Sequence, residues 1–317
     1  MEKSITVREL FDDLFETKRI TGNDDSENRR VYVSEINRPG FELAGFFKHT
    51  EFKRIIILGD KEFAFIEEMS STAQKEIFSV LINDDLPCIV ICKGHTCPKI
   101  LEETANKKNF PIYVTDSATG RVSIELTNRL DEVLAPETLI HGVFLNIYGK
   151  GVIIKGESGI GKSEIALELV KRGHLLVADD AVEIYHIGRS IIGKAPKVLT
   201  NLLEIRGVGV IDVSKMFGIA SIIDRDKVDL IIQLDRWVPS REYTRVTVEE
   251  DDSSEMLLGA SIPKVVVPVS SGRNMSVIIE TAVMNIRLRE SGVDSSKEFV
   301  DRIIQNIDDN KKKEGNM

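Results

Sequence analysis

Two continuous apolar runs stand out in the N-terminal part of the chain, RIIILG at Arg54–Gly59 and PCIVIC at Pro87–Cys92. Short runs of this kind between polar segments predict buried strands. Apolar residues at helical spacing predict a helix at Val7–Thr17, and further helices are expected near Ser70–Leu81 and Cys97–Lys107. Strands that alternate with helices indicate an α/β domain.

The next pattern predicts a hairpin, a helix and a strand. Val143–Tyr148 and Gly151–Lys155 read as two strands joined by a tight turn. Lys162–Arg172 has one apolar face and predicts a helix, which Gly173 is expected to end. His174–Ala178 predicts a short strand that leads into two adjacent aspartates.

The remaining elements complete a second α/β domain. Further strands are expected at Val208–Val213, Asp229–Leu234 and Lys264–Val269, and helices at Asn274–Arg289 and Glu298–Asn306. The polar tail DDNKKKEGNM is expected to be disordered. Asn128–Pro136 is a plausible joint, so the prediction is two α/β domains, residues 1–131 and 132–317.

Composition narrows the class of protein. Of 317 residues, 42% are hydrophobic and 29% are charged, and the net charge of −9 argues against a nucleic-acid partner. No apolar run approaches the ~20 residues of a membrane helix, and the N-terminus lacks a signal-peptide core, so we expect a cytoplasmic protein. Cys88, Cys92 and Cys97 match no common zinc spacing, and buried thiols are expected for the apolar PCIVIC run.

The candidate chemistry begins at GESGIGKS, which satisfies the P-loop pattern G-x-x-x-x-G-K-[ST] between a predicted strand and a predicted helix. Backbone N–H groups of such a loop cradle phosphates, the lysine approaches the β- and γ-phosphates, and the serine hydroxyl binds Mg²⁺. The predicted nucleotide or phosphate site is Gly156, Glu157, Ser158, Gly159, Ile160, Gly161, Lys162 and Ser163.

Three acidic groups compete as partners of the loop. Asp235 ends the apolar run DLIIQLD, Asp212 ends GVGVID, and the pair Asp179-Asp180 ends the strand after the P-loop helix. The pair is the most informative, because one carboxylate could organise magnesium or water while the other acts as a general base. A helix-capping or solvated pair remains the alternative. From the residues alone, a structural role is favoured for His141, because a lone histidine near a strand is more often structural than catalytic. Glu204 and Arg206 are ambiguous, because charges that flank a strand are usually surface residues.

These motifs closely resemble a known family. HGVFLNIYGKGVIIKGESGIGKSEIALELVKRGHLLVADDAVEI, followed by LEIRGVGVIDV, is similar to bacterial HPr kinase/phosphorylase, and INRPGFELAGF at residues 36–46 resembles its N-terminal domain. The resemblance implies a hexameric enzyme that phosphorylates a serine of the phosphocarrier HPr with ATP or pyrophosphate. It also implies the reverse attack of phosphate, which releases pyrophosphate. A C-terminal core similar to that of phosphoenolpyruvate carboxykinase is implied as well.

The resemblance also implies roles for individual residues. Asp180 would be the proton acceptor for the serine, and Asp179 would support it and the metal. His141 would lie beside the reacting aspartate. Ser163 and Glu204 would be the Mg²⁺ ligands. The catalytic set implied by the resemblance is completed by Lys162, by Arg206 in the signature stretch and by Arg245 in EYTRV, a counterpart of the arginine on a mobile family loop.

One segment departs from the family pattern. VVPVSSGRN has Ser270-Ser271 where the family usually has arginine-proline, in a stretch associated with dephosphorylation. Kinase activity is therefore the firmer expectation, ahead of phosphorylase activity. The alternative functions are a small-molecule kinase or an ATPase, which would share the P-loop without needing EIRGVGVID. The absence of an N-K-x-D string argues against a GTPase switch.

Overall fold

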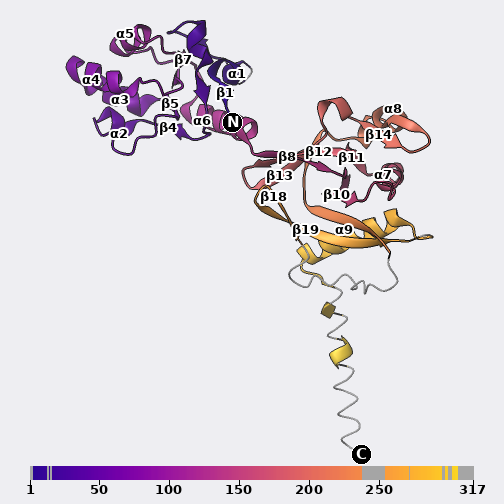
Figure 1. Cartoon of the computed structure of the whole chain (residues 1–317). Helices are drawn as coiled ribbons and strands as arrows, with labels where there is room; N and C mark the ends of the chain where they lie inside the picture. The colour runs from indigo at the N-terminus through magenta and orange to yellow at the C-terminus, as the bar shows by residue number, and fades with distance from the viewer. Residues whose placement is uncertain are drawn as a thin grey trace, which may run out of the picture. The chain divides into compact units, whose positions relative to one another are not determined.

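The computed structural model describes residues 3–12, 14, 16–237, 254–270, 272–294, 297–298 and 302–305 (Figure 1). Two compact units divide between Ala135 and Pro136. The helix α6 (Thr119–Leu134) runs through most of the segment that was expected to be a joint. Its apolar residues Val122, Leu126 and Leu130 are fully buried, so helical packing takes precedence over a linker there.

The N-terminal unit is a five-stranded sheet with helices on both faces. Its strand order is β2-β7-β6-β5-β4, in which β4 to β7 run parallel and β2 is antiparallel. The strands are β2 (Lys18–Arg19), β4 (Ile36–Asn37), β5 (Ile55–Leu58), β6 (Ile89–Ile91) and β7 (Ile112–Val114), with a separate pair β1 (Ile5–Thr6) and β3 (Arg30–Val31). The predicted α/β domain and its two apolar strands are confirmed.

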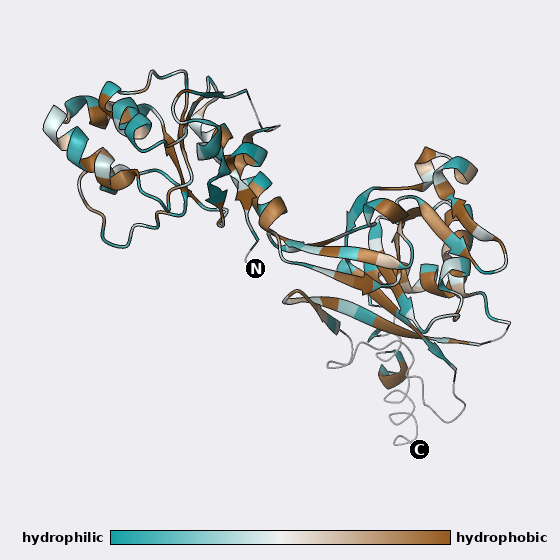
Figure 2. Cartoon of the chain, turned by 45° about the horizontal axis from the view of Figure 1, so that its top comes forward, coloured by the Kyte–Doolittle hydropathy of each residue, from teal (hydrophilic) through white to brown (hydrophobic). Residues whose placement is uncertain are grey.

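Apolar cores lie on both faces of this sheet. One contains residues of α3 (Asp60–Glu68), α4 (Ser71–Leu81) and α5 (Lys99–Lys107), and the other contains residues of α1 (Val7–Phe11) and α6. Two short helices, η1 (Asp24–Asn28) and α2 (Gly40–Leu43), complete the unit. The helices show hydrophilic and hydrophobic residues together, as expected for amphipathic elements (Figure 2).

Two details of this unit bear on the predictions. The helix expected at Val7–Thr17 ends at Phe11, so its predicted length is wrong. Cys88 and Cys92 are fully buried, as predicted, and burial raises the pKa of the Cys92 thiol to about 11.

The C-terminal unit is built on a six-stranded mixed sheet in the order β11-β9-β10-β17-β19-β18. The predicted hairpin is present, because β9 pairs antiparallel with β10, whereas β10, β17 and β19 are parallel. The strands are β9 (Val143–Ile147), β10 (Lys150–Gly156), β11 (Leu175–Ala178), β17 (Leu230–Arg236), β18 (Ser254–Leu257) and β19 (Ala260–Val269).

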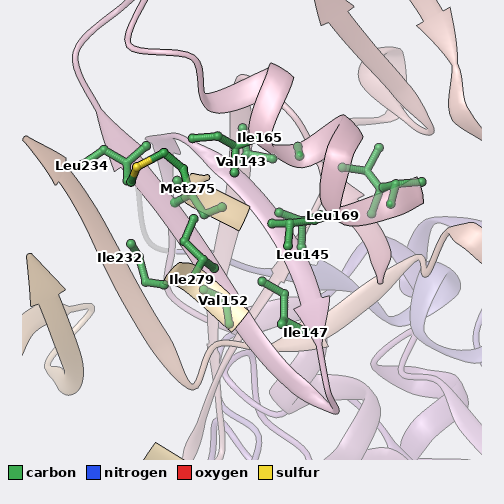
Figure 3. Close-up of a cluster of buried hydrophobic side chains, with 14 of the residues drawn as sticks. Val143, Leu145, Ile147, Val152, Ile165, Leu169, Ile232, Leu234, Met275 and Ile279 are labelled. Carbon is green, nitrogen blue, oxygen red and sulfur yellow. The ribbon is translucent and has the colours of Figure 1, made fainter. Parts of the chain in front are cut away.

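One face of this sheet packs on two helices, α7 (Lys162–Lys171) and α9 (Met275–Glu290). Figure 3 shows the shared core, in which Ile165 and Leu169 of α7 and Ile279 of α9 lie with strand residues such as Val143 and Ile232. The predicted helices at Lys162–Arg172 and Asn274–Arg289 are thus confirmed within a residue.

The sequence did not predict the second sheet of this unit, which has the order β16-β13-β12-β8. A second core, including Phe144, Ile153, Val182 and Ile231, contains residues of both sheets. The strands are β8 (Glu137–His141), β12 (Ala181–Ile187), β13 (Ser190–Lys194) and β16 (Arg225–Lys227). β8 and β12 place His141 opposite Ala181 in register, next to the predicted catalytic pair.

A small hairpin of β14 (Leu202–Ile205) and β15 (Gly209–Asp212) lies against α7. It is followed by α8 (Val213–Phe217) and η3 (Ile219–Ser221), and preceded by η2 (Lys197–Leu199). Residues 297–298 and 302–305 are helical, whereas the rest of the predicted helix at Glu298–Asn306 and the polar tail lie outside the described residues. Within the described ranges, no helix is both long and apolar enough to cross a membrane.

Candidate functional site

The GESGIGKS segment joins the end of β10 to the start of α7, which is the strand–loop–helix arrangement that phosphate cradles use. Gly161 precedes the helix with φ of 99°, a backbone conformation that favours glycine. The Lys162 ammonium donates hydrogen bonds to the carbonyl oxygens of Gly156 and Glu157, at 3.0 and 3.2 Å. The lysine side chain therefore folds back over the loop, where its ammonium adds positive charge to the phosphate site.

The strand β11 brings Asp179 to the first turn of α7. The Ser163 hydroxyl donates to the Asp179 carboxylate, with Oγ 3.1 Å from Oδ1 and 3.3 Å from Oδ2. The backbone N–H of Glu204, in β14, donates to the same carboxylate at 3.0 Å. Asp179 thus joins the P-loop helix to the small hairpin, a contact that the sequence did not predict.

Asp179 is only 4% exposed. Burial raises the pKa of its carboxyl above the usual range, while the Glu204 N–H and the Ser163 hydroxyl act in the opposite direction. A buried carboxylate with donors on one side is costly to hold ionised, so a cation beside it would be strongly favoured.

Asp180 faces a different environment from its neighbour. Its side chain is exposed, and its backbone has φ of 63°, which is uncommon for an L-residue. Its carbonyl oxygen accepts the N–H of Gly142 at 3.2 Å and lies 3.3 Å from Nδ1 of His141. The left-handed turn therefore separates the paired carboxylates into one buried group and one accessible group.

The two signature residues lie close to this centre. Glu204, on β14, has an exposed side chain, and its own backbone N–H is the group that contacts Asp179. Arg206 is exposed in the turn after β14, and its Nη1 is 3.3 Å from the position that a Cβ on Gly159 would occupy. The hairpin thus brings the Arg206 guanidinium alongside the P-loop and the backbone of Glu204 against Asp179.

The competing aspartates have other partners. Asp212 caps α8, where its Oδ1 accepts the Lys215 N–H at 3.1 Å and the Ser214 hydroxyl at 2.6 Å. The Ser214 hydroxyl and Lys215 lower the pKa of Asp212 to about 2, consistent with a capping role. Asp235 lies on β17, next to the P-loop strand, and interacts with Gln233 at 3.3 Å.

Arg245 and Ser271 lie outside the described residues. Ser270 directly follows β19, at the start of the segment that leads to α9, and its carbonyl oxygen accepts the Arg273 N–H at 3.4 Å. Asn274 caps α9 through the Val277 N–H, and its amide also donates to Glu168 of α7 at 2.9 Å. Asn274 thus connects the start of α9 to the P-loop helix.

The fold and this site together define an α/β domain in which a loop with the P-loop sequence leads into α7, and two adjacent aspartates follow the next strand, β11. Comparison with known proteins identifies the family of both units. The model of the HPr Serine kinase C-terminal domain matches residues 132–303, and the model of the HPr Serine kinase N terminus matches residues 5–130.

Curated relatives match over nearly the whole chain. An HPr kinase/phosphorylase of Lactobacillus gasseri is 39% identical over 99% of this chain and 98% of its own, and one of Exiguobacterium sibiricum is 41% identical over 93% and 94%. A solved structure, the Hpr(Ser) kinase/phosphatase from Coxiella burnetii, is 38% identical over 51% of this chain and 98% of its own, with a TM-score of 0.46.

The chain belongs to the HPr kinase/phosphorylase family. It is therefore an enzyme of a bifunctional kinase and phosphorylase class, as the motifs predicted. The likeness to the phosphoenolpyruvate carboxykinase core stays a prediction.

Proposed function

We propose that this chain transfers a phosphoryl group from ATP or pyrophosphate to a serine of HPr, and returns it from phospho-HPr to inorganic phosphate, giving pyrophosphate. One observation supports this most. Ser163 of the P-loop helix contacts the buried Asp179, and the next residue, Asp180, has an exposed carboxylate. An accessible carboxylate next to the buried Asp179 is suited to accept the proton of a substrate hydroxyl, a role that nucleotide storage does not need.

In the forward direction, Asp180 accepts the proton of the substrate serine hydroxyl. The serine oxygen forms a bond to the terminal phosphorus of the donor, while the bond from that phosphorus to the bridging oxygen breaks. In reverse, an oxygen of inorganic phosphate attacks the phosphorus of phosphoserine, and protonated Asp180 returns its proton to the departing serine oxygen. One carboxylate thus serves both directions, as microscopic reversibility requires.

Binding and charge neutralisation fall to the residues around this carboxylate. The backbone of Gly156–Ser163 and the Lys162 ammonium would hold the phosphates, with Arg206 next to the loop. Arg245 is proposed to neutralise charge on the transferring group. His141, which contacts the carbonyl of Asp180, would fix the conformation of the turn that presents the carboxylate.

The donor set suits Mg²⁺. Ser163 and Glu204 are proposed as its protein ligands, and the buried Asp179 as the carboxylate that orients Ser163. Within the described residues, no three His, Cys, Asp or Glu side chains form a metal-binding group. Two protein ligands are enough for Mg²⁺, which usually keeps several waters and takes phosphate oxygens. When bound, the ion would neutralise phosphate charge.

The wider setting is also a proposal. HPr, nucleotide, phosphate and pyrophosphate are the proposed partners of a cytoplasmic homohexamer, with no role for nucleic acid or membrane. The serines at 270–271 replace the arginine-proline of a family stretch associated with dephosphorylation, so the phosphorylase half of the proposal needs its own assay: pyrophosphate released from phospho-HPr, Mg²⁺ and phosphate.

The experiment compares the wild type with Asp180→Asn, using Asp224→Asn, an exposed aspartate of the same unit, as control. Asp180→Asn should lower serine phosphorylation of HPr at least about a hundredfold, the low end for a lost general base, with nucleotide affinity unchanged. Asp224→Asn should match the wild type. Transfer that survives in Asp180→Asn contradicts the base assignment. If the wild type hydrolyses ATP without labelling HPr, the ATPase alternative replaces the proposal.

A further inference from the structure

A partly buried ionic cluster, in which Glu280 and His174 are buried and Arg172 is 38% exposed, lies at the end of α7 away from the P-loop. Glu280 of α9 accepts two hydrogen bonds from Arg172, at 2.9 Å from Nε and 2.6 Å from Nη2. The same carboxylate lies 2.9 Å from Nε2 of His174. One acidic side chain thus holds both residues that flank Gly173, in the turn between α7 and β11.

The cluster is shielded from solvent on its acidic side. His174 is 5% exposed and Glu280 is 7% exposed. The Tyr148 ring packs edge-on against the His174 ring, with centroids 4.7 Å apart. The Arg172 guanidinium lowers the pKa of Glu280 despite its burial, with a smaller contribution from His174, so the carboxylate is held ionised.

Its position matters because the turn connects the two halves of the site. Lys162 and Ser163 begin α7, and Asp179 follows β11. The ten residues of α7 span about 15 Å, so the cluster is well removed from the reacting atoms. Gly173 has φ of 98°, a conformation that reverses the chain between helix and strand. Glycine has no side chain, so the angle between α7 and β11 must be held by its neighbours.

A second contact holds the same two helices together. The Asn274 amide donates to Glu168 of α7 at 2.9 Å, one helical turn before Arg172. The helix α9 therefore contacts α7 through polar groups at residues 168 and 172, in addition to their shared apolar core.

We propose that Glu280 is a positioning residue of the phosphoryl-transfer reaction. Through Arg172 and His174 it fixes the α7–β11 turn, and thereby the spacing between the phosphate-binding start of α7 and the carboxylates that follow β11. This inference rests on the catalytic site proposed above. The P-loop itself is local to the start of α7, so loss of the cluster disturbs alignment for transfer more than nucleotide binding.

The test is Glu280→Gln, which keeps the size of the side chain but removes its charge. The kcat for HPr phosphorylation should fall between about tenfold and a hundredfold, as expected for a displacement of up to about 1 Å. The Kd for Mg-ATP should stay within twofold, with an unchanged binding stoichiometry. A merely structural role would instead lower the stoichiometry along with kcat, and that outcome overturns the proposal, as does a kcat within twofold of the wild type.

A matched control lies on the same helix. Glu290, also in α9, pairs with Lys150 at 2.8 Å, but its side chain is 53% exposed. Glu290→Gln should leave kcat unchanged. If Glu280→Gln does not fold, Arg172→Lys, which keeps the charge but loses the two-point contact, is judged by the same limits. Asp180→Asn in the same assay separates the two claims: if it is inactive while Glu280→Gln behaves as wild type, only the positioning role fails.

Discussion

The Ser163 hydroxyl and the Asp179 carboxylate are in direct contact, with Oγ 3.1 Å from the nearer carboxylate oxygen. Because Asp179 is buried and also accepts the Glu204 N–H, its carboxylate has little freedom to turn away. The hydroxyl is thereby held at a fixed place in the first turn of α7. A hydroxyl held in this way is suited to a metal ligand.

Ser163→Ala is predicted to raise the Mg²⁺ concentration for half-maximal kinase activity about tenfold to a hundredfold, the range for lost metal-site contacts. The matched control is Ser163→Thr, which keeps the hydroxyl and should stay near the wild type. Magnesium titrations of initial rate at saturating ATP give the comparison. Equal magnesium requirements for the two variants would exclude a role for the hydroxyl at the metal.

The left-handed backbone at Asp180 predicts that two substitutions with the same loss of activity will differ in stability. Asp180→Gly and Asp180→Ala both remove the carboxylate, so both should be inactive. Glycine adopts φ of 63° without strain, whereas alanine adopts it only with strain. The free energy of unfolding should therefore be about 1 kcal/mol higher for the glycine variant than for the alanine variant. Urea denaturation followed by circular dichroism measures the difference. An alanine variant as stable as the glycine variant would show that the backbone is relaxed in solution.

How far the sequence predicts this protein depends on the kind of signal. GESGIGKS and the helix after it were predictable because phosphate cradles need glycine, lysine and serine at fixed positions. The β9–β10 hairpin was predictable because its turn is short and its apolar runs are continuous. The helix at Val7–Thr17 was overestimated, since amphipathic spacing persists beyond Phe11 while the helix ends there.

Other features depend on contacts between distant residues. The strands β12 and β13 mix polar and apolar residues, and β13 also contains a glycine. Their apolar residues become a core only when they meet Phe144 and Ile231 of the other sheet. The contact of the Glu204 N–H with Asp179, 25 positions apart, leaves no mark on either residue type. The same is true of Glu280, which is 108 positions from Arg172.

A close approach of strands makes Gly151 a sensitive position. Gly151 lies at the start of β10, and a Cβ there would lie 1.8 Å from the carbonyl oxygen of Lys227. Gly151→Ala is therefore predicted to lower the free energy of unfolding by about 3 kcal/mol, the upper range for overpacking. Gly120→Ala, where a Cβ would meet nothing within 4 Å, is the control and should unfold no more easily. Thermal and urea unfolding compare the two, and equal stability would contradict the crowding at Gly151.

The ionised state of Glu280 gives the protein a specific dependence of stability on pH. The Arg172 guanidinium lowers the pKa of Glu280 from its ordinary 4.5, against the effect of burial, and His174 adds to the lowering. In the unfolded chain the carboxyl regains its ordinary pKa, so near and below 4.5 the unfolded state binds more protons than the folded state. The stabilisation by the carboxylate is thus fully present above that pKa and is lost as pH falls through the folded value.

The wild type should accordingly have a higher Tm than Glu280→Gln at pH 7, because the glutamine leaves Arg172 without its charged partner. The gap should narrow as pH falls below about 4.5, because protonated glutamate then resembles glutamine. Calorimetric scans of both proteins from pH 7 to pH 3 follow the gap, and Glu290→Gln should track the wild type because its ion pair is exposed. A gap that stays constant or widens on acidification would mean that the carboxylate charge does not hold the α7–β11 turn to α9.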